Sequence, residues 1–291
     1  PSTHMFPWDG ATTGYGGGVS GCYLSGGLTT DYDCITLAGA TVGSHRFLIE
    51  HNFIYGFRRG YSGSADDRSV LIQFNNFWNC VAGVYVPNNH PQFTGWNDYR
   101  DCTYGIQGQL VDSKVVGQNF TYCGTGVGPI DTTHYPGRVI FSGCSFAFCT
   151  TDALVIGPQC NVVGCLIALA GVNGVAGIRL IGGNSTIEGC VFDTDGGIFT
   201  EGCISFDPDY RSTAVNGAVI VGNSFRMEGS DVLYHKASAS GRDIGSLTCS
   251  NNTIYDFFPL KGAQSTDLTE VNDTIDFIYY SPPEIEISEL D

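Results

Sequence analysis

Four acidic residues in the C-terminal half of the chain are spaced so that they could act together on one bond. Asp193 and Asp195 are two residues apart, and Glu228 and Asp231 follow one repeat later. Cleavage of a glycosidic bond needs two carboxylates, one to protonate the leaving oxygen and one to activate water or attack the sugar. We therefore take Asp195 and Glu228 as the candidate acid–base or nucleophile pair, supported by Asp193 and Asp231. For each of them, the alternative is a solvated surface or turn residue.

An earlier group combines aromatic residues, an arginine and two further acids. Tyr55, Trp78 and Arg100 each follow an apolar residue at the same place in successive repeats, so alternation along a strand predicts that they point outward. An exposed aromatic ring beside an arginine can hold the apolar face and the hydroxyls of a sugar. Packing beneath a loop or between copies of the chain is the alternative. The candidate substrate-binding group also includes three neighbours, Trp96, Asp98 and Asp101.

The 12 cysteines are interpreted as structural. The sequence has no CxxC pair and no histidine at zinc-finger spacing from a cysteine, so we expect no metal site. Most cysteines recur about once per repeat, and cysteine is a small residue that is often buried. We expect a ladder of buried thiols, with a Cys22–Cys34 disulfide as the alternative.

A repeat with three aligned columns must position all these residues. Its anchors recur at intervals of 21 to 33 residues, and four repeats add Cys three residues later and Gly six residues later, with Asp152 in the Gly place of the fourth. The anchors are Ile54, Phe77, Tyr99, Phe120, Phe146, Ile167, Phe192, Phe225 and Ile254. Five residues earlier lie Ile49, Ile72, Thr94, Val115, Phe141, Val162, Ile187, Ile220 and Cys249. Two residues before the anchors lie Asn52, Asn75, Asn97, Gln118, Cys144, Cys165, Cys190, Asn223 and Asn252.

This repeat predicts an all-β fold, a right-handed single-stranded parallel β-helix of about nine or more coils with a short C-terminal β cap. Equal positions of stacked coils lie ~4.8 Å apart, so each buried column becomes a ladder of like residues. We assign residues 1–5 to an expression scar and 6–45 to an N-terminal cap or first coils. The β-helix covers 46–262, and 263–291 form a C-terminal cap or trimerisation strands.

The columns resemble the right-handed parallel β-helix of the pectate-lyase-like superfamily, above all the body of a bacteriophage tailspike or polysaccharide depolymerase. The resemblance covers roughly residues 46–262, and its motifs are specific for fold but weak for function. It implies a homotrimer in the virion tail, as a spike or fibre, that acts at the extracellular bacterial surface. Its implied partner is a bacterial surface glycan, either capsule or O-antigen.

The expected function is therefore binding and depolymerisation of that polysaccharide, as a glycoside hydrolase with paired carboxylates and no organic cofactor. A non-catalytic structural spike or glycan-binding adhesin is one alternative. A polysaccharide lyase is another, and Ca²⁺ is possible only in that case. The net charge of −16 argues against a nucleic-acid partner. No apolar run approaches ~18–20 residues, so no membrane insertion is expected.

Overall fold

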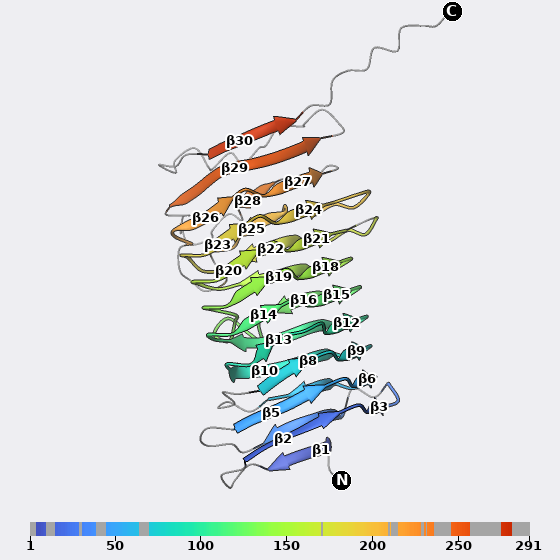
Figure 1. The fold of residues 1–291 in the computed structure, drawn as a ribbon. Helices are drawn as coiled ribbons and strands as arrows, with labels where there is room; N and C mark the ends of the chain where they lie inside the picture. Colours follow the sequence, from blue (N-terminus) through green and yellow to red (C-terminus); the bar gives the residue numbers. More distant parts are fainter. Residues whose placement is uncertain are drawn as a thin grey trace, which may run out of the picture.

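The computed structural model describes residues 4–9, 15–28, 31–38, 45–63, 70–169, 171–208, 210, 215–227, 230, 232–235, 246–256 and 275–280. All the regular elements within these ranges are β-strands. They are stacked in sequence order from β1 at one end to β30 at the other (Figure 1). The described part of the chain contains no helix that is long and apolar enough to cross a membrane.

The strands form three parallel stacks. Stack 1 contains β2 (Tyr15–Ser20), β5 (His45–Glu50), β8 (Val70–Gln73), β11 (Gln92–Phe93), β14 (Lys114–Val116), β17 (Ile140–Ser142), β20 (Asn161–Val163), β23 (Thr186–Glu188) and β26 (Ala218–Val221). Stack 2 contains β3 (Tyr23–Ser25), β6 (Phe53–Tyr55), β9 (Asn76–Trp78), β12 (Asp98–Arg100), β15 (Asn119–Thr121), β18 (Ser145–Ala147), β21 (Leu166–Ala168), β24 (Val191–Asp193) and β27 (Ser224–Met227). Stack 3 contains β1 (His4–Asp9), β4 (Asp33–Ala38), β7 (Arg59–Ser62), β10 (Ala82–Asn89), β13 (Tyr104–Leu110), β16 (Thr125–Gly128), β19 (Asp152–Ile156), β22 (Ala176–Leu180), β25 (Ile204–Phe206) and β28 (Leu233–His235). The long strand β29 (Leu247–Asp256) pairs with β26 and with β27, and β30 (Ile275–Tyr280) pairs with β29.

Each turn of the chain contributes one strand to each stack, and equal strands of successive turns pair in parallel. The solenoid has about seven turns in its central part, from β5 to β25, and further strands extend the same stacks at both ends. The predicted fold class, an all-β parallel β-helix, is confirmed. The predicted number of about nine or more coils differs slightly from this count.

The predicted anchors form one continuous buried column in stack 2. They pair in register from Ile54 through to Ile254. Stacking brings aromatic rings face to face, with centroids 5.1 Å apart for Phe77 and Tyr99 and 4.7 Å apart for Tyr99 and Phe120. Offset stacking of this kind stabilises the core beyond simple area burial.

The second apolar column is correct except at one turn. Phe93, not Thr94, pairs with Ile72 and Val115 and is fully buried. Thr94 is half-buried, and its hydroxyl lies 3.3 Å from the side-chain oxygen of Gln73. The prediction of Thr94 is wrong because this turn has one more residue between the two columns than its neighbours have.

The predicted polar column is a buried hydrogen-bonded ladder. Asn75 shows the pattern, because its amide donates to Asn97 at 3.0 Å and to the backbone oxygen of Ile49 at 2.8 Å. Each amide therefore satisfies both a neighbouring side chain and a backbone carbonyl at the bend. The side-chain bonds of the ladder join Asn52 to Asn75, Asn75 to Asn97, Asn97 to Gln118, and Asn223 to Asn252.

The cysteines are structural in the way the sequence predicts. All 12 are free thiols, and every one except the half-buried Cys22 is buried. The alternative of a Cys22–Cys34 disulfide is therefore wrong. Three of the thiols, Cys144, Cys165 and Cys190, occupy the same column as the amides and continue the ladder.

Candidate functional site

Three turns bring the earlier candidate residues together on the outside of stack 2. Tyr55, Trp78 and Arg100 end β6, β9 and β12, and they are direct partners in the parallel register. Their predecessors in the anchor column are fully buried, so alternation turns these side chains outward. Trp78 exposes 38% of its surface.

A carboxylate holds the tryptophan and the arginine in place. The indole Nε1 of Trp78 donates a hydrogen bond of 2.7 Å to Oδ2 of Asp101. The same oxygen lies 3.6 Å from Nε of Arg100, whose guanidinium carbon is 5.6 Å from the Trp78 ring centroid. Tyr55 meets Trp78 edge to face at 5.8 Å. We call Tyr55, Trp78, Arg100 and Asp101 the Trp78 platform.

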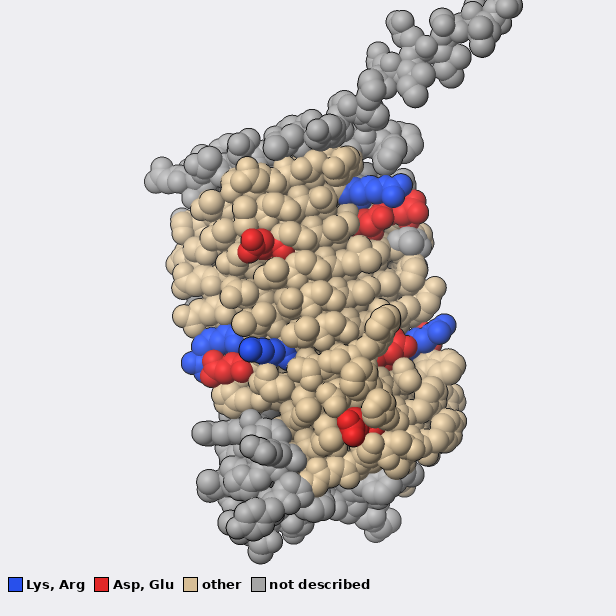
Figure 2. Space-filling model, in the orientation of Figure 1, with Lys and Arg blue, Asp and Glu red and all other residues tan. Residues whose placement is uncertain are grey.

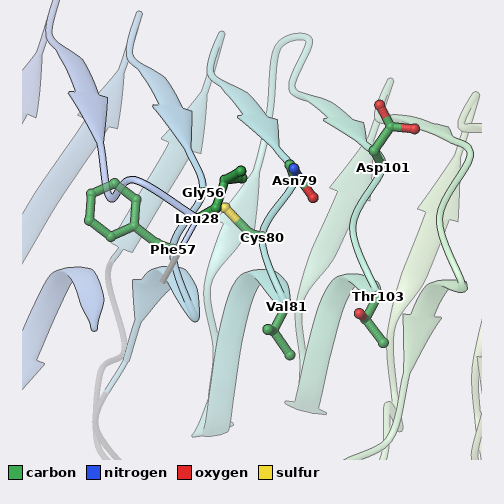
Figure 3. Close-up of a pocket in the computed structure, with 8 residues that line it drawn as sticks. All are labelled: Leu28, Gly56, Phe57, Asn79, Cys80, Val81, Asp101 and Thr103. Carbon is green, nitrogen blue, oxygen red and sulfur yellow. The ribbon is translucent and has the colours of Figure 1, made fainter. Parts of the chain in front are cut away.

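A pocket of about 350 Å³ adjoins the platform and shares Asp101 with it. Figure 3 shows that it crosses successive turns. Asn79 and Asp101 occupy one equivalent position in neighbouring turns, and Val81 and Thr103 occupy another. Asn79 and Asp101 both have φ of 53°, in the left-handed region that Asn and Asp tolerate better than most residues. The Asp101 pocket is lined by Leu28, Gly56, Phe57, Asn79, Cys80, Val81, Asp101 and Thr103.

The two other predicted neighbours lie nearby but make separate contacts. Asp98 is at the start of β12, and its carboxylate accepts a hydrogen bond of 2.5 Å from the amide of Asn119. Trp96 lies in the bend before β12 and is 65% exposed. Among the described residues it has no ring contact with the platform. Four of the six predicted binding residues, those of the Trp78 platform, are thus joined by side-chain contacts.

The later acidic group is described only in part. Asp193 ends β24, in register with Arg226 of β27, and its Oδ2 lies 3.8 Å from Nη1 of that arginine. Asp195 is exposed, and its backbone N–H donates to Oδ1 of Asp193 at 3.2 Å. Glu228 and Asp231 lie outside the described residues. The neighbour of Asp193 on the next turn is therefore a cation.

A cluster that the sequence did not reveal lies on stack 3. The guanidinium of Arg179 on β22 bonds both oxygens of Asp152 on β19, at 2.9 and 3.0 Å. Its Nη1 also lies 2.6 Å from Glu201 and 3.4 Å from Asp207, on either side of β25. Burial acts to lower the pKa of Arg179, but these acidic partners outweigh it and raise the pKa above its ordinary value. We call these four residues the Arg179 cluster.

The repeat pattern does not predict this cluster, because one extra residue precedes Ala153 in this turn. The register pairs Val127 with Leu154, so Ala153 holds the glycine place that the sequence assigns to Asp152. A usable signal was present, since Arg179 is the only basic residue between Arg138 and Arg211 and lies in an apolar run. A charge in such a run is expected to have buried partners.

Ion pairing is common wherever charges occur. In the view of Figure 2, each group of basic side chains lies beside acidic ones, and most of the described surface is uncharged. Within the described ranges, no group of three or more His, Cys, Asp or Glu side chains is arranged to hold a metal ion. Comparison with protein families found no family that matches the chain, and comparison with curated proteins found no match either.

Proposed function

We propose that the protein binds a bacterial surface polysaccharide along the side of the solenoid, at the Trp78 platform and the Asp101 pocket. One observation carries this proposal, namely that Tyr55, Trp78, Arg100 and Asp101 converge from three successive turns beside a pocket. The exposed part of the Trp78 indole suits the apolar C–H face of a sugar ring. The nearby carboxylate suits its hydroxyls, because a carboxylate accepts strong hydrogen bonds.

The hydrogen bond from Trp78 to Asp101 fixes the orientation of the indole ring before a ligand binds. A ring that already has its final orientation loses less side-chain freedom on binding. Successive turns repeat at ~4.8 Å, so an extended glycan lying along the solenoid can meet equivalent side chains of several turns. These features favour a chain of sugars over a single small molecule.

The test compares two aromatic truncations. We expect Trp78→Ala to weaken binding of the target oligosaccharide by about fivefold, since stacking of a sugar on one ring contributes about 1 kcal/mol. Phe74→Ala is the matched control, because Phe74 is 45% exposed and precedes β9 at the end opposite Trp78. Titration calorimetry against capsule and O-antigen oligosaccharides measures both. Equal losses in the two variants, or no binding by the native protein, would contradict the proposal.

Depolymerisation by hydrolysis is the second candidate. It is favoured by the position of Asp195, which is exposed in the turn after β24 and donates its backbone N–H to the carboxylate of Asp193. Asp195 and Glu228 would be the acid–base or nucleophile pair, with Asp193 and Asp231 in support. We expect Asp195→Asn and Glu228→Gln each to reduce reducing-sugar release by at least about 100-fold. Asp112→Asn is the control, as Asp112 pairs with Arg138 and lies between β13 and β14, several turns from Asp195, which follows β24.

The same assay separates the alternatives. Undiminished cleavage by both variants would contradict the assignment of the pair. Products that absorb in the ultraviolet would indicate a lyase instead of a hydrolase. Binding without any product would indicate a glycan-binding adhesin.

A further inference from the structure

We infer that the Asp101 pocket selects uncharged sugar residues and rejects acidic ones such as uronates. This inference rests on the proposed function, because it specifies the class of glycan that the Trp78 platform and its pocket would take. Two observations support it. Polar side chains of the pocket have free hydrogen-bonding capacity within the described part of the chain, and the neighbouring arginines are already ion-paired.

The pocket offers hydrogen-bonding groups that suit hydroxyls. Oδ2 of Asp101 is engaged by Trp78, but Oδ1 has no partner among the described residues. The side chains of Asn79 and Thr103 likewise have no hydrogen bond within that part of the chain. A carboxylate oxygen only accepts, whereas an amide and a hydroxyl both donate and accept. A sugar hydroxyl can satisfy all three groups, but a sugar carboxylate cannot bond to Asp101.

Arg100 and the two arginines that follow the pocket residue Phe57 in the sequence already have acidic partners. Nε of Arg58 lies 2.8 Å from Asp33, and Arg59 lies 3.7 Å from the same carboxylate and over the ring of Tyr85. Arg100 faces Asp101 itself. An acidic sugar would therefore meet the Asp101 carboxylate without an uncommitted cation to offset it, and close like charges cost several kcal/mol in an interface.

The remaining lining and the whole chain favour the same class of ligand. Leu28, Phe57 and Val81 give the pocket an apolar wall, which suits C–H and methyl groups. The net charge of −16 repels polyanionic glycans at a distance as well. Selection against acidic sugars thus operates both at the pocket and across the molecule.

The experiment uses a panel of capsule and O-antigen oligosaccharides in which each uronate-containing member is paired with its carboxyl-reduced form. These pairs differ only in a carboxylate replaced by a primary alcohol. We expect the reduced form to bind at least about tenfold more tightly, and its affinity to change less than about twofold between about 50 and 500 mM salt. We also expect Asp101→Asn to reduce the difference in affinity between the uronate and the carboxyl-reduced oligosaccharide.

The outcomes separate the two proposals. Equal or tighter binding of the uronate form, with binding still lost in Trp78→Ala, would overturn the selection of uncharged sugars and leave the proposed function standing. Failure of every member of the panel to bind the native protein would overturn the proposed function and the inference with it.

Discussion

Arg179 shows how one residue can join three turns of the solenoid. Its guanidinium extends from β22 to a carboxylate on β19 and to two carboxylates on either side of β25, and both Arg179 and Asp152 are buried. A buried ion pair need not stabilise more than a well-packed apolar pair would. Removal of one partner is different, since it leaves the opposite charges buried without compensation.

We expect Arg179→Met to lower the free energy of unfolding by about 3–5 kcal/mol, because three acids then lose their cation. Arg138→Met is the matched control. That arginine pairs with Asp112 where both side chains are 53% exposed, so we expect a loss of about 0–1 kcal/mol. Chemical denaturation measures both. Similar losses in the two variants would show that the Arg179 cluster does not tie the turns together.

The buried thiols make stability sensitive to alkaline pH. Burial raises the pKa of Cys149 and of Cys160 to about 12, from an ordinary value of 9.0. Below pH 9 these thiols are protonated in both the folded and the unfolded state. Between pH 9 and 12 the unfolded state releases their protons first, so stability falls as the pH rises.

We expect each of these thiols to steepen the alkaline loss of stability by about 1 kcal/mol per pH unit in that range. The double variant Cys149→Ala/Cys160→Ala should therefore show a shallower dependence than the native protein above pH 9, whatever its stability at pH 7. Denaturation curves at a series of pH values provide the measurement. Parallel pH dependences for the two proteins would rule out this role for the thiols.

At the scale of elements, stack 3 makes room for the rings of stack 2. A Cβ added to Gly83 on β10 would come within 2.7 Å of the Tyr99 ring, and one added to Gly126 on β16 within 2.6 Å of the Phe146 ring. Gly105 stands in the same relation to Phe120. The glycine that follows the anchor by six residues is thus required by the aromatic column of the next turn.

Gly105→Ala tests this fit. We expect it to destabilise the protein by about 1–3 kcal/mol, since the new methyl group would press on the Phe120 ring and on the backbone oxygen of Gly126. Gly137→Ala is the control, because an added Cβ there would meet nothing closer than 3.6 Å. Thermal unfolding compares the two. An unchanged melting temperature in Gly105→Ala would show that the neighbouring turns can move apart enough to accept the methyl group.

The sequence predicts stacks 1 and 2 because their columns keep a constant spacing. The anchors from Ile54 to Ile254 and the amide ladder follow from that spacing alone. A single inserted residue displaces one column without changing composition, as at Phe93 and Asp152. The contacts of Arg179 with Glu201 and Asp207 depend on the connections before and after β25, which do not follow the columns of the repeat, so no column reveals them.

The candidate binding site is predictable from the sequence only where its residues lie in a column of constant spacing. Tyr55, Trp78 and Arg100 occupy one column, so their convergence follows from the register. The hydrogen bond to Asp101 and the pocket beyond it depend on the left-handed backbone at Asn79 and Asp101. That conformation recurs two residues after the anchor in successive turns, as at Gly56 and Tyr122, but the residue types at this position differ too much to reveal it in the sequence.

At the scale of the whole molecule, stacking produces a long lateral surface with few charges. Most of the described face in Figure 2 is uncharged, although the chain has a net charge of −16. A net charge of this sign repels polyanions at a distance but leaves local sites free to bind neutral ligands. At the Trp78 platform and the Asp101 pocket, aromatic, polar and apolar groups converge on one cavity.

A crystal structure of the protein with a capsule or O-antigen oligosaccharide tests the central claim most directly, since it locates the ligand without assuming an activity. We expect a sugar ring against the exposed part of the Trp78 indole, with hydroxyls bonded to Asp101 and Asn79 in the adjoining pocket. An oligosaccharide bound elsewhere on the solenoid, with the Trp78 platform and the Asp101 pocket empty, would contradict it.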